Sequence, residues 1–196
     1  NLNIFVRQTS CFPSVCEACH TSAMTSYDYV VVGAGSAGAV VAARLTEDPS
    51  VTVLLLEAGP VDDADEISIP AAFANLFKTR WDWGYSTVAQ KQLGGRRAYW
   101  PRMKALGGCS SMNAMIYIRG NRVDYDTWRD AHGATGWGYA DVLPYFMRAE
   151  GNTRLGGPYH GQHGPVRVED RTFTHPLTQA WVESAVASGL KATDDF

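Results

Sequence analysis

Residues 29–38, Tyr29-Val-Val-Val-Gly33-Ala-Gly35-Ser-Ala-Gly38, are the most informative stretch of this chain. The apolar residues 30–32 predict a buried parallel β-strand, because such strands are apolar without alternation. In a strand-turn-helix unit that holds a dinucleotide, Gly33 permits the tight turn, Gly35 lets a pyrophosphate approach, and Gly38 lets the helix pack on the strand. We therefore predict a helix over residues 36–46 whose first amides face phosphate.

A second apolar run, residues 51–56, ends at Glu57 and predicts a second buried strand. Glu57 follows Gly38 at the distance where an acidic side chain accepts hydrogen bonds from a ribose diol. Together the two runs predict a βαβ unit that binds an adenine dinucleotide. The pattern does not separate FAD from NAD, whereas Glu57 disfavours NADP, because it would repel the additional phosphate. Tight βαβ packing without a ligand is the alternative.

A second glycine-rich cluster, Gly107-Gly108 followed by Cys109, lies about seventy residues further along the chain. It predicts a flexible turn with small side chains, where backbone amides could approach a phosphate or a flat ring. Polar and cationic residues surround this turn: Arg102, Lys104, Ser110, Ser111 and Asn113. The alternative is a surface loop with a helix cap at Ser110 or Ser111.

With both clusters present, the chain resembles the glucose-methanol-choline (GMC) family of flavin oxidoreductases from about residue 26 to residue 196. The matching motifs are YDYVVVGAGSAG (27–38), LLLEAGP (54–60), WDWGY (81–85), PRMKALGGCSSMN (101–113), YIRGN (117–121), DYDTW (124–128), GWGY (136–139), VLPYF (142–146) and GQHGP (161–165). Two positions depart from the family pattern: Met103 stands where glycine is most common, and Cys109 where serine is usual.

The resemblance implies FAD as the cofactor and assigns residues to it. The residues implied at the pyrophosphate are Gly33, Gly35, Ser36, Ala37 and Gly38. Glu57 would hold the adenosine ribose, with Ala58 beside it. The residues implied along the cofactor are Arg102, Ala105, Gly107 and Gly108, and those next to the isoalloxazine ring are Asn113, Ala114, Met115 and Ile116. Some relatives attach FAD covalently through a histidine; because Trp100 occupies that position here, we expect non-covalent FAD.

The expected fold class is α/β, with a Rossmann-like FAD-binding domain, in which helices flank a parallel sheet, and the start of an α+β substrate domain. We expect residues 1–23 to be a disordered extension outside the family. Residues 24–150 would be the amino-terminal portion of the FAD-binding domain, and residues 151–196 the start of a truncated substrate-binding domain. Further helices are expected over residues 124–129, 139–150 and 176–190, and a strand over residues 164–168.

Composition excludes several classes of protein. The chain has 196 residues, 45% hydrophobic and 19% charged, which is ordinary for a globular protein. A net charge of −3 gives no reason to expect nucleic acid as a partner. No apolar run approaches the roughly 18 residues of a transmembrane segment.

The amino-terminal cysteines form a pattern that could mislead. Cys16, Cys19 and His20 fit a haem-attachment motif, and Cys11 adds a possible metal ligand. We interpret the pattern as chance and expect no metal, because these residues are too close in sequence for a zinc fold. The cysteines do not suggest a disulfide framework, so a cytoplasmic location is expected.

The resemblance also implies a reaction, in which the CH–OH group of a small-molecule alcohol becomes an aldehyde or ketone as a hydride passes to flavin. The enzyme would be an alcohol dehydrogenase or oxidase, and its electron acceptor, oxygen or another, stays open. The family's catalytic histidine lies near the carboxyl terminus, so we expect it beyond residue 196 and expect this amino-terminal fragment to be inactive. The five histidines here are interpreted as surface or structural.

Two other functions remain open: an FAD-binding module without catalysis, and a flavin-containing enzyme like the hydroxynitrile lyases. Several aromatic residues could wall a substrate pocket, although core packing is the favoured interpretation for them: Trp81, Trp83, Tyr85, Trp100 and Trp128.

Overall fold

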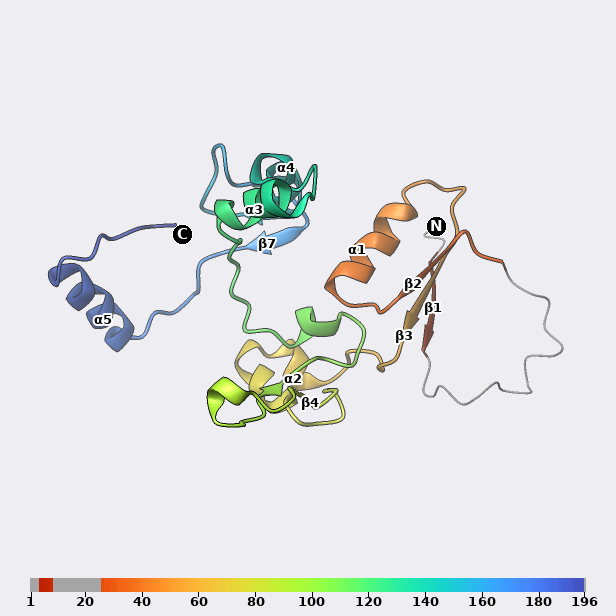
Figure 1. The fold of residues 1–196 in the computed structure, drawn as a ribbon, viewed down its shortest axis with the longest axis horizontal. Coiled ribbons are helices and arrows are strands. Elements are labelled where there is room, and N and C mark those ends of the chain that lie inside the picture. The colour runs from red at the N-terminus through yellow and green to blue at the C-terminus, as the bar shows by residue number, and fades with distance from the viewer. Residues whose placement is uncertain (1–3, 9–25, 196) are drawn as a thin grey trace. The chain divides into compact units, whose positions relative to one another are not determined.

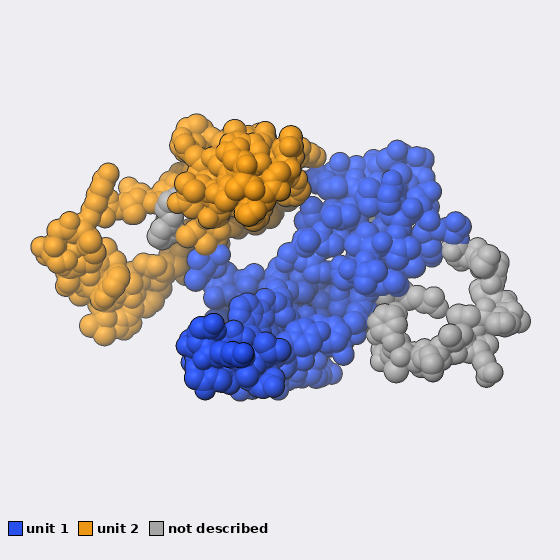
Figure 2. Space-filling view, in the orientation of Figure 1, with its two compact units in different colours: residues 1–116 blue, residues 117–196 orange. Residues whose placement is uncertain are grey.

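The computed structural model describes residues 4–8 and 26–195 of the chain. The chain divides into two compact units, residues 1–116 and residues 117–196 (Figure 2). This division precedes residue 151, where the sequence predicts a domain boundary, because the strand that begins at Glu150 pairs with residues 166–168. The assignment of residues 24–150 to an FAD-binding domain and 151–196 to a substrate domain stays a prediction.

A three-stranded parallel sheet organises the first unit. Its strands are β1 (Ile4–Gln8), β2 (Tyr29–Val32) and β3 (Val53–Glu57), in the order β1-β3-β2. Helix α1 (Ser36–Leu45) joins β2 to β3 and packs against both strands (Figure 1). The predicted βαβ unit and the α/β class are therefore confirmed. The core between helix and sheet consists of Ala34, Ala42, Val53 and Leu55.

The prediction that residues 30–32 are buried is wrong for Val30 and Val32, whereas Val31 is half-buried and packs against the core. Val30 is 57% exposed and Val32 is 78% exposed. The reason is position in the sheet: β2 is an edge strand within the described residues, whereas β3 is paired on both sides. Along β3, alternate residues are fully buried and those between them are half-buried.

Residues 4–8 also differ from expectation. The sequence analysis predicts disorder over residues 1–23, but Ile4–Gln8 forms β1 and pairs with β3 in parallel, from Ile4 opposite Val53 to Gln8 opposite Glu57. Residues 4–6, Ile-Phe-Val, have high β-propensity, and the pairing satisfies backbone groups of β3 that would otherwise lie at a sheet edge. The haem-like pattern of cysteines lies outside the described residues.

The remainder of the first unit is built from short elements. They are α2 (Asp65–Ser68), η2 (Pro70–Leu76), β4 (Tyr85–Ser86), η3 (Lys91–Leu93), β5 (Tyr99–Trp100) and η4 (Gly108–Ser111). Strands β4 and β5 pair antiparallel. A second core in this unit is formed by Leu76, Trp81, Met103, Ala105 and Met112.

The second unit contains α3 (Arg122–His132), α4 (Tyr139–Ala149), β6 (Glu150–Asn152), β7 (Val166–Val168) and α5 (Pro176–Ala187). The predicted helices and strand are present with shifted ends, and β6 was not predicted. In α5, Leu177 is 74% exposed and Trp181 is 73% exposed, so these two side chains pack in no core among the described residues. No helix among the described residues has the length and apolarity needed to span a bilayer.

Candidate cofactor site

The two glycine-rich clusters meet in the first unit. The amide of Gly107 donates to the carbonyl of Ala34 at 2.9 Å, although these residues lie far apart in sequence. A Cβ atom added to Gly108 would lie 2.6 Å from the Cα of Gly35, so the two backbones approach this closely only because residue 108 is glycine. The clusters therefore form one cradle rather than two loops.

The start of α1 is suited to an anion. A Cβ atom on Gly38 would lie 1.9 Å from the carbonyl oxygen of Gly33, which explains the close packing of helix and strand. The helix has no side-chain cap at its amino terminus and no acidic residue in its first turn. Uncapped amides and the helix dipole favour phosphate there. The hydroxyl of Ser36 lies 2.8 Å from that of Ser110, which joins the second cluster to the helix start.

Glu57 lies at the end of β3 and is 7% exposed. One carboxylate oxygen accepts from the amide of Ala34 and the other from the amide of Gly59, both at 2.8 Å. These bonds fix the orientation of the carboxylate at the end of the βαβ unit. Each oxygen keeps a second lone pair, which a ribose hydroxyl can use.

A cavity of about 740 Å³ opens beside the cradle. Seven of the residues that the sequence assigns to the cofactor line it: Gly33, Gly35, Ser36, Glu57, Ala58, Arg102 and Gly108. The others are not among its lining residues: Ala37, Gly38, Ala105, Gly107, Asn113, Ala114, Met115 and Ile116. Of these, Ala105 is fully buried in the second core.

Residues 113–116 have a distinct geometry. Met115 has a φ of 57°, which is unfavourable for a residue with a side chain. Its amide donates to the side-chain oxygen of Asn113 at 2.7 Å, and this bond holds the turn. Met115 is 55% exposed and Ile116 is 79% exposed. Strained backbone of this kind is common at ligand-binding sites. The assignment of residues 113–116 to the isoalloxazine ring stays a prediction.

Three aromatic residues form a wall on the cavity, which is the interpretation that the sequence favoured less. Trp83, Tyr85 and Trp100 all line it and are 42%, 52% and 50% exposed, so core packing is wrong for these three, although it is right for Trp81 at 5%. The rings of Trp83 and Tyr85 are stacked, with centroids 5.7 Å apart and planes inclined by 7°. The two residues are separated by one position, which places extended side chains on the same face. That spacing was the available signal.

Two positively charged side chains contact the rings of this aromatic wall. The Lys104 ammonium lies 4.7 Å from the centre of the Trp83 ring, and the Arg102 guanidinium lies 5.3 Å from that of Trp100. The cavity therefore combines a phosphate-binding helix start, an acidic group, a flat aromatic surface and positive charge. These are the features that a dinucleotide carrying a planar ring requires.

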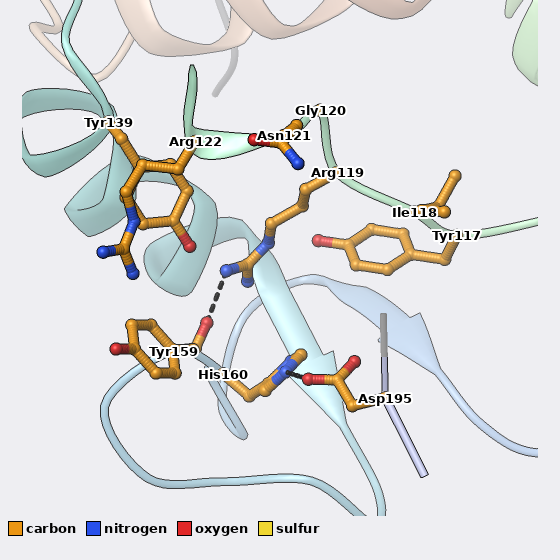
Figure 3. Close-up of a pocket in the computed structure, with 10 residues that line it drawn as sticks. All are labelled: Tyr117, Ile118, Arg119, Gly120, Asn121, Arg122, Tyr139, Tyr159, His160 and Asp195. Carbon is orange, nitrogen blue, oxygen red and sulfur yellow. Dashed lines mark hydrogen bonds and ion pairs between the residues drawn. The ribbon is translucent and has the colours of Figure 1, made fainter. Parts of the chain in front are cut away.

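A second cavity, of about 630 Å³, lies wholly within the second unit (Figure 3). The Arg119 guanidinium donates to the backbone carbonyl of Tyr159 and to the buried carboxylate of Glu150. One ring nitrogen of His160 lies 2.8 Å from Glu150, and the other lies 2.9 Å from Asp195. Figure 3 shows Arg119 directed at the carbonyl of Tyr159 and His160 directed at Asp195.

The charges of this network shift the pKa of two members. Burial would raise the pKa of Glu150, but donors on Asn152 and His160 and the charge of Arg119 outweigh it and lower that pKa. Burial would likewise lower the pKa of His160, yet its bonds to Glu150 and Asp195 raise it. Both ring nitrogens of His160 are engaged by carboxylates, which is consistent with the structural role expected for this histidine, whereas the buried Nε of Arg119 has no hydrogen-bond partner.

A family model described as GMC oxidoreductase matches residues 27–196. The chain belongs to this family. Among curated GMC relatives, human mitochondrial choline dehydrogenase is 49% identical over 178 residues, which is 87% of this chain and 30% of the human protein. The chain thus spans less than a third of the length of that relative.

Solved structures agree with this membership. Pyridoxine 4-oxidase from Mesorbium loti is 40% identical, with a TM-score of 0.79 over 85% of this chain and 33% of that protein. An FAD-dependent oxidoreductase from Chaetomium thermophilum is 34% identical, with a TM-score of 0.78 over 87% of this chain and 31% of that protein. The cofactor that these comparisons support is FAD.

Proposed function

We propose that this chain supplies the dinucleotide cradle of an FAD-dependent oxidoreductase that acts on the CH–OH group of a small-molecule alcohol. The observation that carries the proposal is the backbone contact between Gly35 and Gly108. It brings the helix start, Glu57 and the aromatic wall to one cavity. Relatives named choline dehydrogenase and pyridoxine 4-oxidase support a hydroxyl-bearing substrate for the whole protein.

The chain's own residues would bind and orient the cofactor. The uncapped first turn of α1 would receive the pyrophosphate, and Glu57 would accept from ribose hydroxyls. Trp83 and Trp100 would provide apolar surface for a flat ring. When bound, FAD supplies the acceptor for a hydride. We propose that FAD is held non-covalently, with Trp100 at the position where some relatives carry a histidine.

The first experiment is a titration of the purified chain with FAD and, separately, with NAD, followed by quenching of tryptophan fluorescence. We expect saturable binding of FAD alone. The variant Gly35→Val should abolish it, because the added methyl groups would enter the pyrophosphate path. Ala39→Val, on the exposed side of the same helix, is the matched control and should bind normally. If both variants bound FAD equally well, the proposal that the glycine cradle holds the cofactor would be refuted.

A second experiment separates oxidation from the two other functions. An alcohol substrate should bleach the flavin of the whole protein under anaerobic conditions. Persistence of the oxidised flavin while product forms would favour a lyase, and absence of turnover would favour a binding module. No histidine lines the cavity among the described residues, so we expect no turnover by the chain alone. The cytoplasmic location stays a prediction, which imaging of the tagged protein would test.

A further inference from the structure

The motif WDWGY at residues 81–85 contains an aspartate, Asp82, for which the proposed cofactor site gives no role. Asp82 lies three residues before β4, between Trp81, which is buried in the core, and Trp83, which lines the cavity. Its own side chain is half-buried and is not part of the cavity lining.

The carboxylate of Asp82 gathers donors from four places in the chain. One oxygen accepts from the amide of Gly84 at 3.0 Å and from the amide of Arg102 at 3.1 Å. The other accepts from the amide of Lys78 at 2.9 Å and from the hydroxyl of Tyr99. A carboxylate has about four acceptor sites, and all are used here.

These four hydrogen bonds favour the ionised form of the Asp82 carboxylate. Partial burial would raise the pKa of Asp82, but the hydrogen bonds from Tyr99 and from the three amides lower it to about 2. Lys78 has a φ of 58°, an unfavourable conformation for a non-glycine residue, and its amide points at the carboxylate. Holding a strained residue in place requires surrounding structure that over-determines it.

The segments that Asp82 joins are the ones that carry the aromatic wall. Beside Asp82, the amide of Trp83 donates to the carbonyl of Arg102 at 2.9 Å. Tyr85 of β4 and the preceding Trp83 line the cavity on one segment, and β5 with the following residues contributes Trp100 and Arg102. Strands β4 and β5 share two residue pairs, and backbone hydrogen bonds continue the pairing on both sides, from Lys104 to Trp81 and from Thr87 to Ala98. The Asp82 carboxylate adds side-chain hydrogen bonds at the end that carries Trp83 and Arg102.

We propose that Asp82 is the positioning residue for the aromatic wall of the cofactor site, which it holds against the glycine cradle through Tyr99, Arg102 and Gly84. The proposal rests on the proposed function, because it takes the flavin to be the occupant of this cavity. Asp82 does not contact the cofactor. It acts through Trp83 and Trp100.

The test compares Asp82→Asn with Asp48→Asn in the full chain. Asp48 is an exposed carboxylate that accepts two hydrogen bonds from Ser50, and it does not line the cavity. Asp48→Asn therefore controls for the loss of a negatively charged side chain that accepts local hydrogen bonds. Asp82→Asn replaces one carboxylate oxygen, which accepts hydrogen bonds, by an NH2 group that would face other donors. We expect FAD to bind about tenfold more weakly, which corresponds to the loss of a single hydrogen bond to a charged group, and Asp48→Asn to bind normally.

The second readout is the fluorescence of bound flavin at saturating FAD. Tryptophan in contact with the ring quenches this fluorescence, so a displaced wall should make bound FAD brighter even where all protein is folded. A merely structural aspartate would lower the melting temperature and leave the bound-state fluorescence unchanged, which would overturn the proposal. Failure of wild-type protein to bind FAD would instead overturn the proposed function.

Tyr99→Phe keeps the experiment decisive if Asp82→Asn does not fold. The variant removes one donor to the carboxylate and keeps the ring, which packs at 6.5 Å from the ring of Phe77. We expect a smaller increase in bound-flavin fluorescence than with Asp82→Asn. The two substitutions together should change FAD binding by less than the product of their separate effects, because they break one network. An unchanged bound-state fluorescence in Tyr99→Phe would contradict the network.

Discussion

The substitution Glu150→Gln should destabilise the second unit strongly. The carboxylate is fully buried, and it accepts from Arg119, from the side-chain amide of Asn152 at 2.8 Å and from His160. Glutamine has the same shape, but it leaves the Arg119 guanidinium buried without a counter-charge and turns an amide group toward donors. Removing one partner of a buried ion pair costs about 3–5 kcal/mol of unfolding free energy.

Hydrogen exchange can measure this loss within the affected unit. The backbone amide of Asn152 donates to the carbonyl of Gly161 at 2.8 Å, and this bond lies beside the network. A loss of about 3–5 kcal/mol corresponds to exchange that is roughly 100-fold to 4,000-fold faster at this amide. The amides of β3, in the other unit, provide the internal reference and should exchange at the wild-type rate.

Glu169→Gln is the matched control for this prediction. Glu169 forms an ion pair with Arg167 at 2.7 Å, but both side chains are at least half exposed. Exposed pairs contribute about 0–1 kcal/mol, so exchange at Asn152 should change little. Equal rates in Glu150→Gln and Glu169→Gln would refute the reasoning, because burial would then have no effect on the cost of losing a carboxylate.

Three further predictions follow from local geometry. Gly38→Ala should destabilise the first unit by about 1–3 kcal/mol through overpacking, whereas Gly35→Ala, whose nearest contact would be 3.8 Å, should leave urea unfolding unchanged and weaken FAD binding. Folding raises the pKa of His160, so the stability that its ion pairs contribute should be complete below the pKa of histidine in the unfolded chain, about 6.5, and should be lost as pH rises through the folded pKa. His160→Asn should remove this pH dependence of the melting temperature. Asn121→Ala should cost about 1 kcal/mol in thermal unfolding, because the side chain caps α3 by accepting from the amide of Val123; an unchanged melting temperature would contradict this role.

The amino-acid sequence was sufficient for the local unit around Gly33, Gly35 and Gly38. An apolar run, a glycine triplet and an acidic residue at fixed spacing specify strand, turn and helix through short-range sterics and capping. For that reason the parallel βαβ unit, α1 and the position of Glu57 could be predicted, along with the family resemblance that implies FAD.

Three-dimensional packing was needed for everything that depends on distant partners. Whether Val32 is buried depends on which strands lie beside it, and whether Trp83 lines a cavity while Trp81 fills a core depends on how β4 meets β5. The contact between Gly35 and Gly108 and the convergence of four donors on Asp82 join segments that no local pattern relates. Sequence periodicity records which face of an element is apolar, but only the folded chain fixes what that face meets.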